Sequence, residues 1–239
     1  MSCDIHFRVE KRVDGEWKPA EQMVANKYWE PGSDEPETEP KKLYDGRNYS
    51  LFAILADVRN GRGFAGCDTG DGFNPIAPPR GLPADVSKSV SEDSERWGSD
   101  GHSHSWFTLD ELLAYDWTQT TKQRGYVDGL EAEEWFRMKE WNVRPESYFG
   151  DVGGGGVKKI PISEMETIIT GIKTELKDHP WETIQDTIRT RLRSVYAQAE
   201  WEIDYASCCK DFWYGTIPKL LQIAPGKPEN VRIVFWFDN

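Results

Sequence analysis

The histidines are the residues of this chain whose types and spacing most directly suggest chemistry. His6 lies two residues after Asp4 in CDIHF, and His102 and His104 have the same spacing in DGHSHSW. Residues two apart in an extended segment share a face, so each pair is predicted to point to one side. The two pairs together offer three imidazoles and one or two carboxylates, from Asp4 and Asp100.

Three interpretations of these histidines remain open at the level of sequence. Asp4, His6, His102 and His104 form a ligand set suited to a divalent metal such as zinc or manganese, which would activate water. Without a metal, His6, His102 and His104 could supply a general base and a general acid for cleaving a phosphodiester. In the third interpretation DGHSHSW is a loop, whose imidazoles bond backbone carbonyls while Ser103 and Ser105 cap the helix that follows.

A second group of residues suggests an anion site in glycine-rich turns. Its members are Arg47, Asn48, Arg59, Asn60, Arg62 and Arg80. Guanidinium groups bind phosphate or carboxylate through two parallel hydrogen bonds, and glycine lets backbone N–H groups approach an anion closely. Trp106 follows the histidine pair and is placed to stack on a base. The alternative is that the arginines pair with nearby acids, namely Asp57, Asp68, Asp71 and Asp85.

Composition limits the classes of partner. The 239 residues contain 29 Lys plus Arg against 41 Asp plus Glu, so the formal net charge of -12 argues against binding long nucleic acid. No apolar run approaches the length of a membrane span, and no leader pattern follows Met1, so we expect a cytosolic protein with reduced cysteines and no membrane contact. Eleven tryptophans exceed what one small core needs, which favours a homodimer.

The motif-bearing half, residues 1–120, is predicted to begin with a strand over 3–13 and a turn at Asp14-Gly15. An acidic, proline-bearing loop over 30–41 is expected to be mobile. The pattern of 47–60 predicts a buried helix that stops at Gly61, and residues 60–87 form a long ordered loop of functional type. A short helix is predicted from Thr108 to Asp116.

The second half is predicted to be mainly helical. Helices are expected over 130–141, from Ser163 with Glu166 completing a capping box, and from Trp181 to about Cys208. The last two would form an antiparallel pair within residues 160–209. A closing strand over 230–238 places Val231, Ile233, Phe235 and Phe237 on one face. Strands at both ends predict a single α+β domain, residues 1–239, whose antiparallel sheet includes the first and last strands.

Four motifs occur in an order that resembles a known protein family. They are CDIHFRVE, RNYSLFAILADVRNG, PIAPPRGLPADVS and DGHSHSW, within residues 3–115. In this order they resemble a set of largely uncharacterised proteins encoded by tailed bacteriophages and prophages. The resemblance implies a non-structural accessory role in a phage setting and supplies no catalytic assignment.

That setting suggests counter-defence in the host cytoplasm, because many bacterial defence pathways signal with cyclic or related nucleotides. The first hypothesis is an enzyme that hydrolyses a small phosphate-containing, nucleotide-like ligand, with or without a divalent metal. The second is a binding protein that sequesters this ligand without turnover. The third is an acidic inhibitor that occupies a basic host enzyme, in line with the charge of the 30–41 loop.

Overall fold

The computed structural model describes residues 3–33, 36–138 and 143–238. The chain combines helices with sheets and groups into two compact units. The first unit is made of Met1–Asn60, Asn74–Thr118 and Ala206–Asn239, and the second is made of Gly61–Phe73 and Gln119–Tyr205. The predicted domain over residues 1–239 thus contains two units, which are described separately below.

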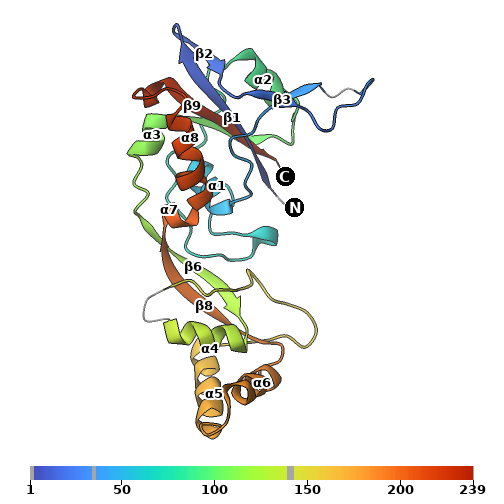
Figure 1. Ribbon diagram of the computed structural model, residues 1–239, viewed down its shortest axis with the longest axis vertical. Coiled ribbons are helices and arrows are strands. Elements are labelled where there is room, and N and C mark those ends of the chain that lie inside the picture. The colour runs from blue at the N-terminus through green and yellow to red at the C-terminus, as the bar shows by residue number, and fades with distance from the viewer. Residues whose placement is uncertain (1–2, 34–35, 139–142, 239) are drawn as a thin grey trace. The chain divides into compact units, whose positions relative to one another are not determined.

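The first unit is built on a four-stranded antiparallel sheet in the order β2-β1-β9-β5 (Figure 1). Its strands are β1 (Asp4–Val13), β2 (Glu16–Pro19), β9 (Val231–Asp238) and β5 (His102–Thr108). Asp14 and Gly15 both have positive φ, 54° and 86°, as a tight two-residue hairpin turn requires. The predicted α+β class, with the first and last strands paired in one antiparallel sheet, is confirmed.

Strand β9 is buried on both faces, whereas the sequence predicts burial of the odd-numbered face alone. On the even-numbered face, Val234 and Trp236 pack with Val90 of α2 (Lys88–Glu95) and with Trp97. On the other face, Phe237 contacts Phe52 of α1 (Tyr49–Ala56). A strand with a neighbour on each side and a layer on each face has no solvent side, so its polarity need not alternate.

The remaining elements of the first unit are short. They are β3 (Met23–Ala25), β4 (Thr38–Pro40), α3 (Leu109–Ala114), α7 (Tyr205–Cys208), the π-helical turn η3 (Asp211–Thr216), α8 (Ile217–Leu221) and the 3-10 turn η4 (Pro228–Asn230). Helix α3 confirms the predicted short helix after Thr108. The backbone N–H of Thr108 donates to the carboxylate of Glu111, which is the capping contact expected at the start of this helix.

Two boundaries in this unit differ from the prediction. Helix α1 ends at Ala56 and not at Gly61, because Asp57 at its C-cap has a left-handed φ of 58°. Asp57 can take this role because a short polar side chain tolerates the left-handed region. The acidic 30–41 loop is also partly ordered into a strand, since Thr38–Pro40 pairs with Met23–Ala25.

The second unit packs helices on a three-stranded sheet in the order β6-β8-β7. Figure 1 labels its strands β6 and β8 and its helices α4, α5 and α6. Its elements are η1 (Phe64–Gly66), β6 (Thr120–Val127), α4 (Gly129–Met138), β7 (Lys158–Ile160), α5 (Ile162–Glu175), α6 (Trp181–Arg191) and β8 (Val195–Asp204). Strand β8 is antiparallel to β6 and parallel to β7. Trp201 of β8, Met165 of α5 and Ile188 of α6 share one buried cluster.

The predicted long helix from Trp181 to Cys208 is wrong. Helix α6 ends at Arg191, and Ser194 then adopts a left-handed φ of 58° before strand β8 begins. Val195, Ala197, Ala199 and Trp201 alternate at period two, and the last three are fully buried or nearly so. The helical pair within residues 160–209 therefore consists of α5 and α6 alone, which contact each other.

The predicted capping box at Ser163 is also wrong. Helix α5 starts at Ile162, and Pro161 occupies the N-cap position with φ of -58° and ψ of 145°. Proline suits a helix start because its φ is already set near the helical value and it has no N–H that needs an acceptor. The predicted helix over 130–141 is confirmed as far as Met138, and residues 139–142 lie outside the described part of the chain.

Candidate functional site

Two neighbouring strands bring the acidic and imidazole groups of the first unit together. Asp4 and His6 lie two residues apart on β1, and the register pairs them with Asp238 and Trp236 of β9. Residues directly opposite in an antiparallel pair point to the same face, so all four side chains share one face of the sheet. The shared face of Asp4 and His6, predicted from their spacing, is confirmed, since β1 pairs with β9 in regular register across these residues.

His6 forms an imidazole–carboxylate pair with Asp238. The His6 Nε2 atom lies 3.1 Å from Asp238 Oδ2, and the two side chains are only 16% and 19% exposed. The other oxygen, Oδ1, accepts the backbone N–H of Asp4 at 2.9 Å. An ionised carboxylate can only accept, so Nε2 must donate to it and the lone pair of a neutral imidazole then resides on Nδ1. This tautomer is the one that can act as a general base.

Two indole rings hold the imidazole of His6 in place. Trp97 lies against it with ring centroids 3.8 Å apart, and Trp236 stacks at 5.5 Å with an interplanar angle of 18°. Trp97 directly follows α2, and Trp236 comes from the central strand β9. Aromatic neighbours on two sides restrict rotation of the imidazole, so the ring is positioned before any ligand arrives.

His6 and Asp238 line a cavity of about 470 Å³. The cations of the lining are Arg8, Lys42 and Arg96, and the carboxylates are Asp4, Glu21, Glu39, Asp45, Asp93 and Asp238. Arg8 bonds both Glu21 at 3.1 Å and Asp93 at 2.7 Å. Neither Lys42 nor Arg96 forms an ion pair with another described residue. The lining carries more carboxylates than cations, in contrast to the anion site that the sequence predicts around the arginines.

Arg47 joins this site through Asp4. Its Nε and Nη2 atoms donate to the two carboxylate oxygens of Asp4 at 2.7 and 2.6 Å, a bidentate pair at the surface. These hydrogen bonds lower the pKa of the Asp4 carboxyl below its ordinary value. Both Asp4 oxygens are engaged with Arg47, so Asp4 is an ion-pair partner in this structure and not a free ligand.

The other two motif histidines occupy different places. Ser103 has a left-handed φ of 52°, and the register of β5 against β9 shifts between His102 and Ser105. This bulge places His104 against Trp236, at 5.8 Å, and His102 beside Phe237, which lies on the opposite face of β9. The predicted shared face of His102 and His104 is therefore wrong, because a bulge adds one residue and reverses the alternation.

The structure does not bring the predicted metal ligands to one point. Trp236 belongs to the strand between β1 and β5, so its indole separates His6 from His104. His102 bonds the hydroxyl of Ser103 through Nδ1, at 3.0 Å, and its buried Nε2 has no hydrogen-bond partner in the part of the chain that the structure describes. Within the described residues, no group of three or more His, Cys, Asp and Glu side chains is arranged to hold a metal ion.

The arginine group is likewise distributed over several sites. Arg80 bonds Glu111 at 2.8 Å and lies over the ring of Trp106, at 5.2 Å, away from the histidine cavity. Arg59 lies over Tyr49 at 5.3 Å. Arg62 belongs to the second unit, where its backbone forms an isolated antiparallel β-bridge with Asp68.

The two asparagines of this group have local structural roles. The side-chain oxygen of Asn48 accepts the N–H groups of Ser50 and Leu51 at the start of α1, and its amide donates to the carbonyl of Cys208. Asn60 donates to Asp57 at 2.7 Å. Among the acids considered as alternative partners, Asp85 pairs with Arg232, while Asp68 and Asp71 pair with Arg124.

Sequence reasoning missed Asp238, Trp97, Lys42 and Arg96 as members of the cavity. Of these residues, only Asp238 could have been found from the sequence. It lies at the end of the predicted closing strand, and antiparallel pairing with the opening strand places it opposite Asp4. Nothing in the local pattern around Trp97 or Arg96 marks either residue, since both follow α2 in an irregular segment.

The chain matches no protein-family model, no curated protein sequence and no solved structure. The geometry of the cavity is therefore the basis for inference about function. In the described part of the chain, no helix combines the length and apolar character needed to cross a membrane.

His104 gives this region a testable pH dependence. Burial, with a smaller contribution from His102, lowers the pKa of His104 below its ordinary value of 6.5. As pH falls below about 6.5, the unfolded chain takes up a proton at this position before the folded chain does, so stability is lost through the folded-state pKa. We expect His104→Gln to reduce the slope of unfolding free energy against pH, by at most about 1.4 kcal/mol per pH unit.

Urea unfolding of both proteins between pH 7.5 and 5 measures this effect. Comparing the two slopes isolates the contribution of His104 from that of the rest of the chain, which the two proteins share. Equal slopes in the two proteins would show that His104 titrates alike in the folded and unfolded states.

Proposed function

We propose that the histidine cavity binds a small phosphate-containing, nucleotide-like ligand such as a cyclic nucleotide and hydrolyses it. The observation that carries this proposal is the His6–Asp238 pair in the wall of a cavity of about 470 Å³. A partly buried imidazole that donates to a carboxylate through one nitrogen can accept a proton through the other and so act as a general base. Trp97 lines the same cavity and offers aromatic surface for a base.

The chemistry assigned to this pair is the addition of water across a P–O bond. Nδ1 of His6 takes a proton as the water oxygen attacks phosphorus, and the bond from phosphorus to the leaving oxygen breaks. The imidazolium then returns the proton to the leaving oxygen, so that His6 ends neutral. Asp238 stabilises the positive imidazolium in between and keeps the ring in the required tautomer.

Charge in the cavity decides how a phosphate would be held. Lys42 and Arg96 are the lining cations that have no ion-pair partner among the described residues, so they are assigned to the phosphate oxygens. Carboxylates still outnumber cations in the lining, even with Arg47 neutralising Asp4. This excess favours a ligand that arrives with a divalent cation, and metal dependence is therefore part of the test.

The biological setting comes from the motif resemblance to phage and prophage proteins. A small accessory protein of this kind would act in the host cytoplasm and remove a nucleotide signal of a defence pathway. Sequestration of the same ligand in the same cavity, without turnover, is the closest alternative, since it uses Lys42, Arg96 and Trp97 but not the proton transfer.

A panel of cyclic and linear nucleotides tests both forms of the proposal. Each nucleotide is incubated with the protein in Mn²⁺ or in EDTA and followed by chromatography. We expect at least one nucleotide to be converted to a product of one added water. If all survive, heating the washed protein shows whether intact ligand is released, which would replace hydrolysis by sequestration. If no nucleotide is cleaved or retained, the proposal fails in both forms.

One observation favours a second function, binding of a basic protein. Met23, Tyr28 and Trp29 are exposed to 59%, 69% and 38%, next to the acidic 30–41 loop. Exposed aromatic and thioether groups beside carboxylates are typical of a protein-binding surface. A host protein retained by the native chain but not by Tyr28→Ser, with all charges kept, would support this function.

A further inference from the structure

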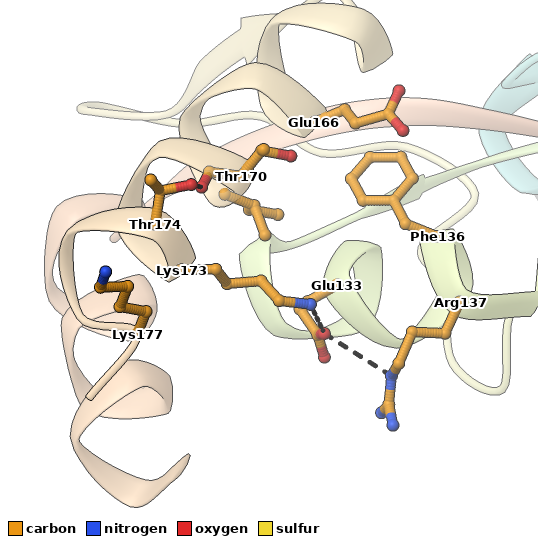
Figure 2. Close-up of a pocket in the computed structure, with 9 residues that line it drawn as sticks. Glu133, Phe136, Arg137, Glu166, Thr170, Lys173, Thr174 and Lys177 are labelled. Carbon is orange, nitrogen blue, oxygen red and sulfur yellow. Dashed lines mark hydrogen bonds and ion pairs between the residues drawn. The ribbon is translucent and has the colours of Figure 1, made fainter. Parts of the chain in front are cut away.

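A groove in the second unit has features of a second ligand site that the histidine chemistry does not use. It lies between helices α4 and α5 and has a volume of about 500 Å³. Figure 2 shows its side chains, with Glu133, Phe136 and Arg137 projecting from α4 and Thr170, Lys173 and Thr174 projecting from α5. All of these residues belong to the second unit, whereas the histidine cavity belongs to the first.

A buried carboxylate anchors the cations of this groove. Glu133 is only 3% exposed, and its Oε1 atom lies 2.9 Å from Lys173 Nζ and 3.5 Å from Arg137 Nε. The two cations approach the carboxylate from different helices, as the dashed lines in Figure 2 show. A carboxylate removed from water requires such partners, so Glu133 holds both cations at the groove.

The groove carries a surplus of positive charge in an acidic protein. Among the described residues, Arg137, Lys173 and Lys177 line it together with Glu133 and Glu166, which makes three cations against two carboxylates. Lys177 forms no ion pair with another described residue. In a chain with a net charge of -12, a locally positive groove attracts anions that the rest of the surface repels.

The walls beside these cations are apolar. Phe136 from α4 and Ile169 from α5 line the groove, and Ile169 is also part of the buried cluster of this unit. The hydroxyl of Thr174 donates to the backbone carbonyl of Thr170, so it is already engaged within α5. The combination of an aromatic ring, an aliphatic side chain and clustered cations suits a ligand with a flat apolar part and an anionic end.

We propose that this groove binds a phosphate monoester of an aromatic group, with a nucleoside monophosphate as the representative ligand. Lys177 and Lys173 contact the phosphate, Arg137 adds to the local positive field, and the ring lies against Phe136 and Ile169. The proposal stands independently of hydrolysis in the histidine cavity, because the two sites share no residue.

Isothermal titration of the full-length protein with AMP, adenosine and inorganic phosphate at low ionic strength tests this inference. We expect AMP to bind more tightly than either part alone. Lys177→Gln should weaken AMP binding about fivefold, because one cation is lost without breaking an ion pair. Lys158→Gln is the matched control, since this exposed lysine of β7 lies in the same unit outside the groove, and it should leave affinity within about twofold.

A variant of opposite sign makes the test specific. Glu133→Gln removes a negative charge, while the amide oxygen can still accept a hydrogen bond from Lys173 and keep it at the groove, so AMP should bind more tightly, again by about fivefold. Arg96→Gln alters the lining of the histidine cavity alone, so the AMP binding that Lys177→Gln weakens should keep its affinity in this variant. AMP affinity that falls equally in Lys177→Gln and Lys158→Gln would overturn the inference, and so would weaker binding by Glu133→Gln in a folded protein. Loss of binding in Arg96→Gln would assign AMP to the other site.

Discussion

Replacing Arg232 with methionine should destabilise the folded protein by about 3–5 kcal/mol. Arg232 lies on the central strand β9 with its side chain only 2% exposed, and its Nε atom bonds Glu10 Oε2 at 2.7 Å. Glu10 is fully buried, so removal of the guanidinium leaves an unpaired carboxylate inside the protein. The guanidinium also lies 4.2 Å from the ring of Trp17 and bonds Asp85, and these contacts are lost as well.

Urea unfolding at pH 7 measures this loss, and two further variants identify its cause. Arg12→Met removes an exposed arginine from neighbouring strand β1 and should cost less than about 1 kcal/mol. Combining Arg232→Met with Glu10→Gln should recover part of the stability, because no buried charge then lacks a partner. If the double variant is less stable than Arg232→Met alone, packing and not charge explains the effect.

His6→Gln should lower nucleotide hydrolysis by about 10²–10⁴-fold, the usual contribution of a positioned general base. Glutamine has a similar reach but cannot take a proton from water at neutral pH. Asp238→Asn should cause a large loss of the same kind, since an amide at this position can donate to His6 Nε2 and then favours the wrong tautomer. Steady-state rates with the nucleotide that the panel identifies measure both effects.

His104→Gln is the matched control for this experiment. His104 flanks Trp236 as His6 does, but from strand β5, and it does not line the cavity. We therefore expect its rate to stay within about threefold of the native rate, well below the loss typical of a general base. A rate for His6→Gln equal to that of His104→Gln would remove His6 from the mechanism. Unchanged ligand retention by His6→Gln would separate proton transfer from binding.

The parts of the fold that follow from near neighbours could be predicted from sequence. Alternation of Ile5, Phe7 and Val9 with polar residues predicts β1, and the Asp14-Gly15 pair predicts its turn. The capping pattern of Thr108 and Glu111 predicts the start of α3. Each of these signals acts within a few residues, where backbone sterics and local hydrogen bonds decide the conformation.

Where the local sequence is compatible with both a helix and a strand, tertiary packing determines which of the two forms. Residues 195–204 contain small and apolar residues compatible with a helix, yet Ala197, Ala199 and Trp201 pack into the cluster of the second unit as a strand between β6 and β7. The ladder partners that stabilise this strand lie far away in sequence, so local propensity carries no information about them.

The sequence by itself determined the α+β class, the pairing of the end strands and the shared face of Asp4 and His6. Only the tertiary structure placed Asp238 beside His6 and Trp97 against the imidazole of His6. It also placed His104 against Trp236, whose indole lies between His104 and His6. Those placements depend on the register of β1 against β9 and on one bulge at Ser103. A shift of one residue in the pairing of β1 with β9 would turn each side chain to the other face of the sheet. That register is set by contacts between segments more than 200 residues apart.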